Sequence, residues 1–249
     1  MIFNECYIGI ISVDKTVGEK VRDRVKVKLK LPEEKINVYV FERATNPLHY
    51  DRSLSTNHQI IVRDAFKKNY KYVLVFEDDV EFYENVDTLD VLHTSFTELQ
   101  KQKGWEIYLM GGLNFGYIFN VDKHLQRCIM CLGLHAYIMS REGMEKFIKA
   151  DFSKLITYPI INFSPFQNDC GVTAWMKTYI SNPQIAYQSR MPRGIKSIFS
   201  HFNENDTKLL QPFLANTCNY VSSLCLLITI YVLYKFISCI YGYFQRIKI

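Results

Sequence analysis

The sequence predicts an α/β fold, with a mainly parallel sheet and helices on both of its faces, and three observations support this. Short apolar runs alternate with longer amphipathic segments through the first half of the chain. The runs at 6–13 and 72–76 are dominated by apolar residues, as expected for strands buried on both faces. With 249 residues and 48% hydrophobic composition, the chain can bury one good-sized core.

In the first half we expect three strands and two helices between them. The strands are predicted at 6–13, 36–41 and 72–76, and the helices at 16–31 and 56–69. The spacing within 16–31 favours a helix, although residues 25–29 also alternate as a strand would. Residues 42–54 contain Asn46-Pro47 and have mixed polarity, which indicates a loop. Ser55 is then the expected N-cap of the second helix.

The second half is expected to add shorter elements to the same sheet. Helices are predicted at 89–102, 141–150 and 170–179, and strands at 107–110, 118–119, 131–140 and 184–188. Ser140 is the expected N-cap of the middle helix, and Asp169 is expected to open the last one. The basic and then polar segment 190–206 is predicted to close over the domain.

Charge and cysteine content exclude two function classes. The net charge is +5, and the Lys and Arg residues are dispersed except at 15–35, where acids accompany them. That cluster is interpreted as the solvated face of a helix, so no nucleic-acid partner is expected. The seven cysteines show no framework spacing, and only Cys128 and Cys131 form a close pair. This argues against a disulfide scaffold or a zinc site and weakly favours a reducing compartment.

The C-terminal stretch differs from the rest of the chain. Residues 209–234 include no charged side chain, and the apolar character continues past Lys235 to Phe244. This is long enough to cross a bilayer of about 30 Å. We therefore divide the chain into a domain at 1–205, a linker at 206–217 and a transmembrane helix at 218–244, with a buried core helix as the alternative. Without an N-terminal signal, a C-terminal anchor with the domain on the cytosolic side is the default expectation.

Three consecutive acids, Glu77, Asp78 and Asp79, follow the strand predicted at 72–76. Unpaired carboxylates are too costly to bury, so the strand should end at Phe76 and deliver the acids to its C-terminal edge. Open α/β sheets bind ligands at that edge. Clustered carboxylates there suit a hard cation, Mn²⁺ or Mg²⁺, that holds phosphates. The alternative is a charged loop without a ligand.

The same segment resembles glycosyltransferase family 25, which includes lipooligosaccharide glycosyltransferases and procollagen galactosyltransferases. The resemblance begins with Ser55-x-x-His58 and Ala65, followed by the apolar strand that runs into Glu-Asp-Asp at 73–80. It continues in the order of the family with 135–140 and Gly143, then with Asp169, and ends with the strand at 183–188. It covers roughly residues 57–188.

This resemblance implies a GT-A-like (Rossmann-related) fold, a nucleotide-sugar donor such as a UDP-hexose, and transfer to a hydroxyl of a glycan or protein. Galactose or glucose is the favoured sugar, and the transfer is expected to invert. Asp79 would be the direct metal ligand, with Glu77 and Asp78 sharing the metal shell and the sugar or ribose hydroxyls. His201 is a further candidate metal ligand or acceptor contact.

Five other positions are interpreted, four of them with a structural alternative beside the functional role. Asp169 is the candidate catalytic base, because the dipole of a helix start keeps it ionised, but it could equally be a simple N-cap. His58 is a candidate donor contact or a core residue. Gly111 and Gly112 could let the backbone approach the sugar or could form a turn. His135 is interpreted as a core histidine.

Two other functions compete with glycosyl transfer. The same acids could serve a metal-dependent phosphohydrolase, although no further Asp/His cluster is present. The chain could also be a membrane-anchored protein that retains the fold without catalysis.

Overall fold

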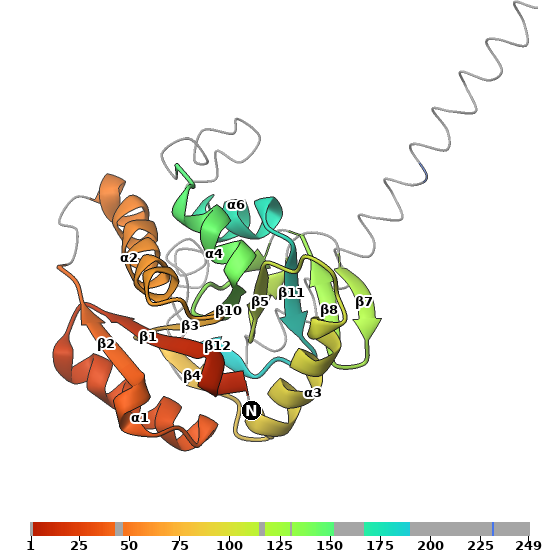
Figure 1. Ribbon diagram of the computed structural model, residues 1–249, viewed down its shortest axis with the longest axis horizontal. Helices are drawn as coiled ribbons and strands as arrows, with labels where there is room; N and C mark the ends of the chain where they lie inside the picture. Colours follow the sequence, from red (N-terminus) through yellow and green to blue (C-terminus); the bar gives the residue numbers. More distant parts are fainter. Residues whose placement is uncertain are drawn as a thin grey trace, which may run out of the picture.

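The computed structural model describes residues 2–42, 47–114, 118–129, 131–151 and 167–189, together with Tyr231. Its centre is an eight-stranded sheet (Figure 1). The strand order is β2 (Ile36–Val40), β1 (Cys6–Ser12), β3 (Tyr72–Glu77), β10 (Ala136–Ser140), β5 (Ile107–Leu109), β11 (Thr178–Ser181), β8 (Leu125–Cys128) and β7 (Ile118–Asp122). Only β10 and β8 run against the other strands of this sheet. The predicted mixed α/β class with a mostly parallel sheet is therefore confirmed.

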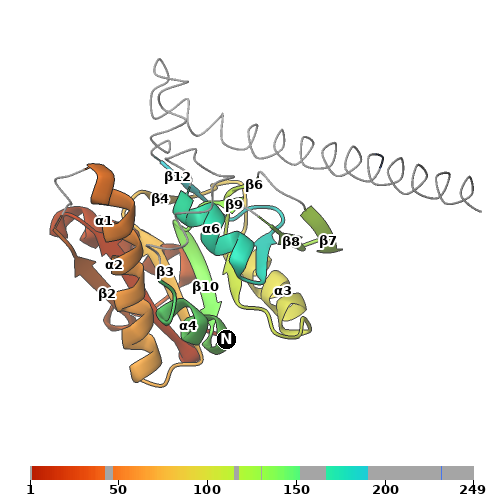
Figure 2. The same ribbon diagram turned by 90° about the horizontal axis from the view of Figure 1, so that it is seen from above.

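Helices cover both faces of the sheet, also as predicted (Figures 1 and 2). One core cluster joins alternate residues of β1, β3 and β10 to α1 (Lys15–Leu29) and α3 (Thr88–Gln100). The other joins the intervening strand residues to α2 (Pro47–Lys67), α4 (Arg141–Ile148) and α6 (Gln167–Trp175). Because successive strand residues point to opposite faces, the apolar runs of β1 and β3 supply both clusters.

Two small sheets and two short helical turns complete the described part of the chain. β4 (Val80–Phe82) pairs with β12 (Ala186–Gln188), and β6 (Leu113–Asn114) pairs with β9 (Cys131–Leu132). The 3₁₀ turns are η1 (Ile2–Glu5) and η2 (Glu33–Lys35). The pairing of β4 with β12 folds the segment after the acids back against the last described strand.

Helix caps explain why several predicted boundaries are correct. Ser140 caps α4, since its Oγ accepts a hydrogen bond from the Gly143 N–H at 3.1 Å. Asp14 caps α1 through the Val17 N–H, and Asp87 caps α3. Each side chain satisfies a backbone donor that the first turn of a helix leaves without a partner.

The predicted loop at 42–54 is wrong over most of its length, because α2 begins at Pro47. Proline is favoured at the first position of a helix, where its missing N–H costs no hydrogen bond. A residue interpreted as a helix breaker is thus the helix start. Ser55 consequently lies inside α2 and is not its N-cap.

Other boundaries also need correction. The strand expected at 131–140 is divided into β9 and β10 by a turn in which Gly133 has a φ of +127°. The helix expected at 170–179 is α6, which begins at Gln167 and ends at Trp175, so residues 178–181 form β11. β4 and β8 were not expected, and β3 extends one residue further, to Glu77.

The predicted closing segment 190–206, the linker and the transmembrane helix lie outside the described residues, apart from Tyr231. Among the residues that are described, no helix has the length and apolar character needed to cross a bilayer.

Candidate functional site

The three acids Glu77, Asp78 and Asp79 lie at the end of β3 and in the turn after it, which we call the acidic turn. This turn lies where the connections that follow β1 and β3 lead to opposite sides of the sheet order. β1 continues through α1 to β2 on one side, whereas the chain after β3 continues toward β5 on the other. Asp78 bridges the two strand ends: its Oδ2 lies 3.0 Å from the Ser12 Oγ and accepts from the Val13 N–H at 3.3 Å. In open α/β sheets, such a switch point is where ligands bind.

Glu77 is turned toward a different partner. Its Oε1 lies 3.2 Å from the His58 Nε2, and the His58 Nδ1 lies 3.1 Å from the Tyr137 hydroxyl. His58 is buried, whereas the Glu77 side chain retains 12% exposure. If Nε2 carries the proton, the imidazole donates to Glu77 and accepts from Tyr137. Elements α2, β3 and β10 are joined by this chain of contacts.

The backbone at Asp79 is held by groups from two other elements. Its carbonyl accepts from the Ser189 N–H at 2.8 Å, and its Oδ1 is a buried atom. The next residue, Val80, begins β4 and accepts from the guanidinium of Arg24 through its carbonyl. The position of Asp79 is therefore defined by groups from α1 and from the end of β12.

The contacts of the three acids can be compared with the predicted metal ligands. Within the described ranges, no three His, Cys, Asp or Glu side chains gather as a metal cluster. Glu77 contacts His58 and Asp78 contacts the end of β1, and a share of either residue in a metal shell stays a prediction. Magnesium and similar ions commonly use one or two carboxylates with substrate phosphates. Asp79 fits such a site, and its role as metal ligand stays a prediction. His201 lies outside the described residues.

Gly111 and Gly112 follow β5 and are covered by the chain before β12. A Cβ at Gly111 would collide with the Ala186 carbonyl oxygen. The Gln184 side chain spans Gly112, accepting from its N–H at 3.1 Å and donating to its carbonyl at 2.7 Å. Gly111 thus has a packing reason to lack a side chain, and the backbone of Gly112 is bound by Gln184. The contact of either glycine with a donor stays a prediction.

His135 belongs to the same edge of the sheet and is fully buried. Its carbonyl accepts from the Glu77 N–H at 2.8 Å. Burial lowers the pKa of its imidazole to about 4, against a smaller opposing effect of the Ala186 backbone. The ring is therefore neutral at physiological pH, which agrees with the expected core histidine.

Asp169 is the third residue of α6 and not the residue before it. One turn later, the Thr173 Oγ1 accepts from the Cys131 N–H at 2.8 Å and donates to the Cys131 carbonyl at 3.0 Å. These bonds fasten α6 to β9, next to β6 and the edge of the sheet that carries Gly112. Position 169 still lies in the first helical turn, where a carboxylate is favoured by the helix dipole.

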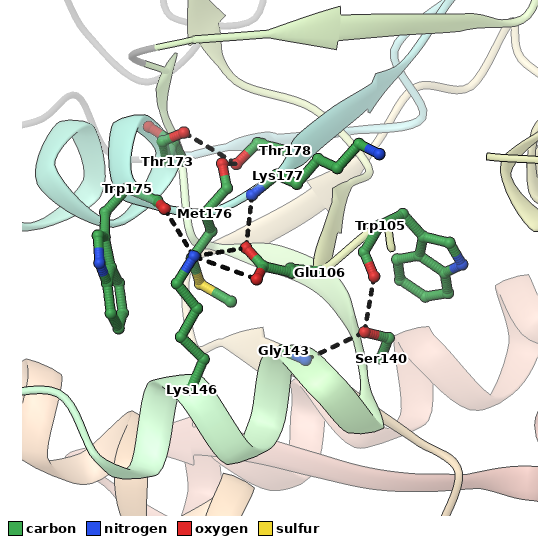
Figure 3. Close-up of polar contacts among 10 residues, drawn as sticks. All are labelled: Trp105, Glu106, Ser140, Gly143, Lys146, Thr173, Trp175, Met176, Lys177 and Thr178. Carbon is green, nitrogen blue, oxygen red and sulfur yellow. Dashed lines mark hydrogen bonds and ion pairs between the residues drawn. The ribbon is translucent and has the colours of Figure 1, made fainter. Parts of the chain in front are cut away.

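The other end of α6 is held by an ion pair (Figure 3). The Lys146 ammonium donates to the Trp175 carbonyl at 2.8 Å and to both carboxylate oxygens of Glu106, at 3.1 and 2.9 Å. Glu106 also accepts from the Lys177 N–H at 2.7 Å. A cation at the last carbonyls of a helix complements its dipole. The orientation of α6 is thus determined at both ends.

Sequence reasoning did not single out Ser12 or Arg24, and it included Tyr137 only as part of the motif at 135–140. Of these residues, Ser12 is the one that the sequence could have pointed to, because it is a polar residue at the C-terminal end of an apolar strand. Tyr137 and Arg24 are distant from the acids in sequence, and only the folded chain places them at this site.

Together, the mostly parallel sheet and the helices on both of its faces define a protein of the α/β class. No protein-family description and no curated protein matches the chain. Three solved structures are similar in fold: A197 from STIV, a glycosyltransferase involved in the glycosylation of the major capsid of PBCV-1, and a mannose-1-phosphate geranyltransferase from Thermus thermophilus.

These similarities are coarse. A197 shows 15% identity and a TM-score of 0.41 over 70% of this chain and 80% of its own. The PBCV-1 enzyme shows 12% identity and a TM-score of 0.41 over 65% of this chain and 72% of its own. The Thermus protein shows 10% identity and a TM-score of 0.38 over 71% of this chain and 73% of its own.

Proposed function

We propose that this chain is a nucleotide-sugar-dependent glycosyltransferase with a GT-A-like fold, related to family 25. The observation that carries the proposal is the bridge from Asp78 to Ser12 and Val13, which places the acidic turn at the sheet's switch point. A ligand bound there meets carboxylates from β3 and the start of α1. The family-like order of motifs along the chain supports the same assignment.

The start of α1 favours a phosphate-bearing ligand. Residues 13–16 are exposed, and they form the connection after β1 and the start of α1. Helix N-termini attract anions because their backbone N–H groups point outward and the dipole is positive there. Lys15 adds a cation to this turn, whereas the Asp14 carboxylate is used as the cap.

In the proposed reaction, Asp79 would hold a divalent cation, Mn²⁺ or Mg²⁺, beside the donor's phosphates, with His201 as the further candidate ligand. Such an ion stabilises the charge that develops on a nucleoside diphosphate leaving group. His58 orients Glu77 toward the sugar or ribose hydroxyls. Asp169 takes the proton of the acceptor hydroxyl, which belongs to a glycan or a protein. A hexose, galactose or glucose, is transferred with inversion.

The test is an assay of the purified full chain with Mn²⁺ and a panel of nucleotide sugars, scored by release of nucleoside diphosphate. Asp79→Asn should lower the rate by about 10²–10³-fold, and Asp169→Asn by about 10²–10⁴-fold. Asp90→Asn is the matched control, since Asp90 is an exposed acid in the first turn of α3.

Two outcomes would replace the proposal. Release of inorganic phosphate alone would favour the phosphohydrolase. No release by a folded protein, with any donor and either metal, would favour the non-catalytic alternative.

We further propose that residues 218–244 anchor the chain in a membrane, because 209–234 carry no charged side chain. Fractionation should find the full chain in membranes and resistant to carbonate extraction. Recovery in the supernatant would contradict the anchor without affecting the transfer proposal.

A further inference from the structure

We propose that Arg24 of α1 is a positioning residue that holds the acidic turn so that the Asp79 carboxylate is fixed for its ligand. This inference rests on the proposed function, since it takes Asp79 as the residue that meets metal and donor. Neither the sequence pattern nor the motif resemblance pointed to Arg24.

The guanidinium of Arg24 contacts the two residues that directly follow the acids. One nitrogen, Nη1, donates to the Val80 carbonyl, and the other, Nη2, lies 2.8 Å from the Glu81 Oε1. The pair is partly shielded, with side-chain exposures of 32% for Arg24 and 26% for Glu81. Two contacts from one planar group fix both the position and the direction of the segment.

Asp79 is thereby held between contacts to the end of β1 and contacts to α1. On its N-terminal side, Asp78 is bonded to Ser12 and Val13, which lead into the first turn of the helix. On its C-terminal side, Val80 and Glu81 are bonded to Arg24, further along the helix. The Ser189 N–H fixes the carbonyl of Asp79 itself. A binding group works best when its supporting residues leave it little freedom, and this arrangement provides that.

Arginine suits this role better than lysine. Lysine could reach one acceptor as a point charge, but it lacks the planar fork that engages a carbonyl and a carboxylate together. The comparison of Arg24→Lys with Arg24→Met therefore separates charge from geometry. Arg22 offers the matched control: it lies on the same helix and is similarly exposed at 26%, but it pairs with Glu33, away from the acids.

The first measurement is amide hydrogen exchange of the full chain over residues 77–83. Loss of a hydrogen bond to a charged group should raise exchange there by about tenfold in Arg24→Met, and less in Arg24→Lys. Arg22→Met should leave this segment as in the wild type. Should Arg24→Met fail to fold, Glu81→Gln removes the ion pair with Arg24 while the side chain keeps nearly the same shape. Unchanged exchange would overturn the proposal.

The second measurement is titration with Mn²⁺ alone, followed by the electron paramagnetic resonance of the free ion, beside steady-state kinetics with the active donor. Arg24→Met should weaken Mn²⁺ binding and raise the Mn²⁺ concentration for half-maximal rate by about tenfold, with Arg24→Lys between it and the wild type.

The outcomes separate the two proposals. Faster exchange in Arg24→Met with wild-type Mn²⁺ binding and kcat/KM would mean that Arg24 is only structural, and would overturn the positioning role. A wild type that binds no Mn²⁺ and transfers no sugar would overturn the proposed function, and with it the role of Arg24 toward the metal. Hydrogen exchange would then still show whether Arg24 holds the turn.

Discussion

The imidazole of His58 lies between the Glu77 carboxylate, 3.2 Å from Nε2, and the Tyr137 hydroxyl, 3.1 Å from Nδ1. This contact joins the long helix α2 to the last residue of β3 and to the antiparallel strand β10. A buried histidine with both nitrogens engaged is a rigid support for the carboxylate at the edge of the sheet.

Replacement of His58 should therefore reduce stability as well as orientation. We expect His58→Ala to lower the free energy of unfolding by about 1.5–3 kcal/mol, because a hydrogen bond to a carboxylate is lost in a buried setting. Urea unfolding measures this. His93→Ala, an exposed histidine of α3, should change stability by less than about 0.5 kcal/mol, and equal losses in the two variants would contradict the role of the buried contact.

Gly111 should tolerate no side chain. In Gly111→Ala, the new Cβ would meet the Ala186 carbonyl oxygen, and backbone must move to relieve the clash. We expect a loss of about 1–3 kcal/mol, the usual cost of overpacking. Gly171→Ala is the control: its Cβ would meet nothing within 4 Å in α6, so the change should stabilise by up to about 1 kcal/mol.

His135 should make the protein less stable in mild acid. The pKa of its imidazole is about 4 in the folded protein and 6.5 ordinarily, because burial disfavours the charged form. Above pH 6.5 neither state binds the proton. As the pH falls from 6.5 to about 4, only the unfolded chain binds it, and stability declines.

The decline amounts to about 3 kcal/mol at most, since one unit of pKa corresponds to about 1.36 kcal/mol. Urea unfolding between pH 7 and 4 in the presence of EDTA measures it. His135→Gln should have a flatter pH profile than the wild type, while His93→Gln should not. Parallel profiles for His135→Gln and wild type would refute the prediction.

Lys146 and Lys149 on α4 form a matched test of two ion pairs. Lys146 is bonded to Glu106 and to the Trp175 carbonyl with only 32% side-chain exposure, whereas Lys149 pairs with Glu145 at 71%. Lys146→Met should cost about 1.5–3 kcal/mol in thermal or urea unfolding. Lys149→Met should cost about 0.5 kcal/mol or less. A larger effect at Lys149 would contradict the fastening of α6.

The sequence was most informative where local and global preferences agree. The short, Val-rich run before Glu77 favours a buried strand by both its length and its composition. A serine followed by a glutamate two residues later correctly placed the start of α4 at Arg141. The start of α2 was missed because Pro47 is compatible with either a turn or a first helical position. β12 lies within the strand predicted at 184–188, whereas the three-residue strand β4 was missed because it depends on pairing with β12.

The candidate site shows the same division. That the acids lie at the carboxyl edge of β3 followed from the cost of burying them. The divergence of Glu77 and Asp78 did not, since it depends on His58 and Ser12, which come from other elements. Adjacency in sequence brought three carboxylates to one place, but their partners turned two of them apart.

The hydrogen bond from Ser189 to the Asp79 carbonyl has a practical consequence for anyone who shortens this protein. A chain that stops before Ser189 would lose this hydrogen bond to the acidic turn, and we expect it to lose activity for that reason alone. Soluble versions should therefore keep the polypeptide through this serine and carry any purification tag beyond it. Loss of activity on deeper truncation would indicate that the acidic turn is disturbed. It would not by itself prove that the apolar C-terminal stretch takes part in the reaction.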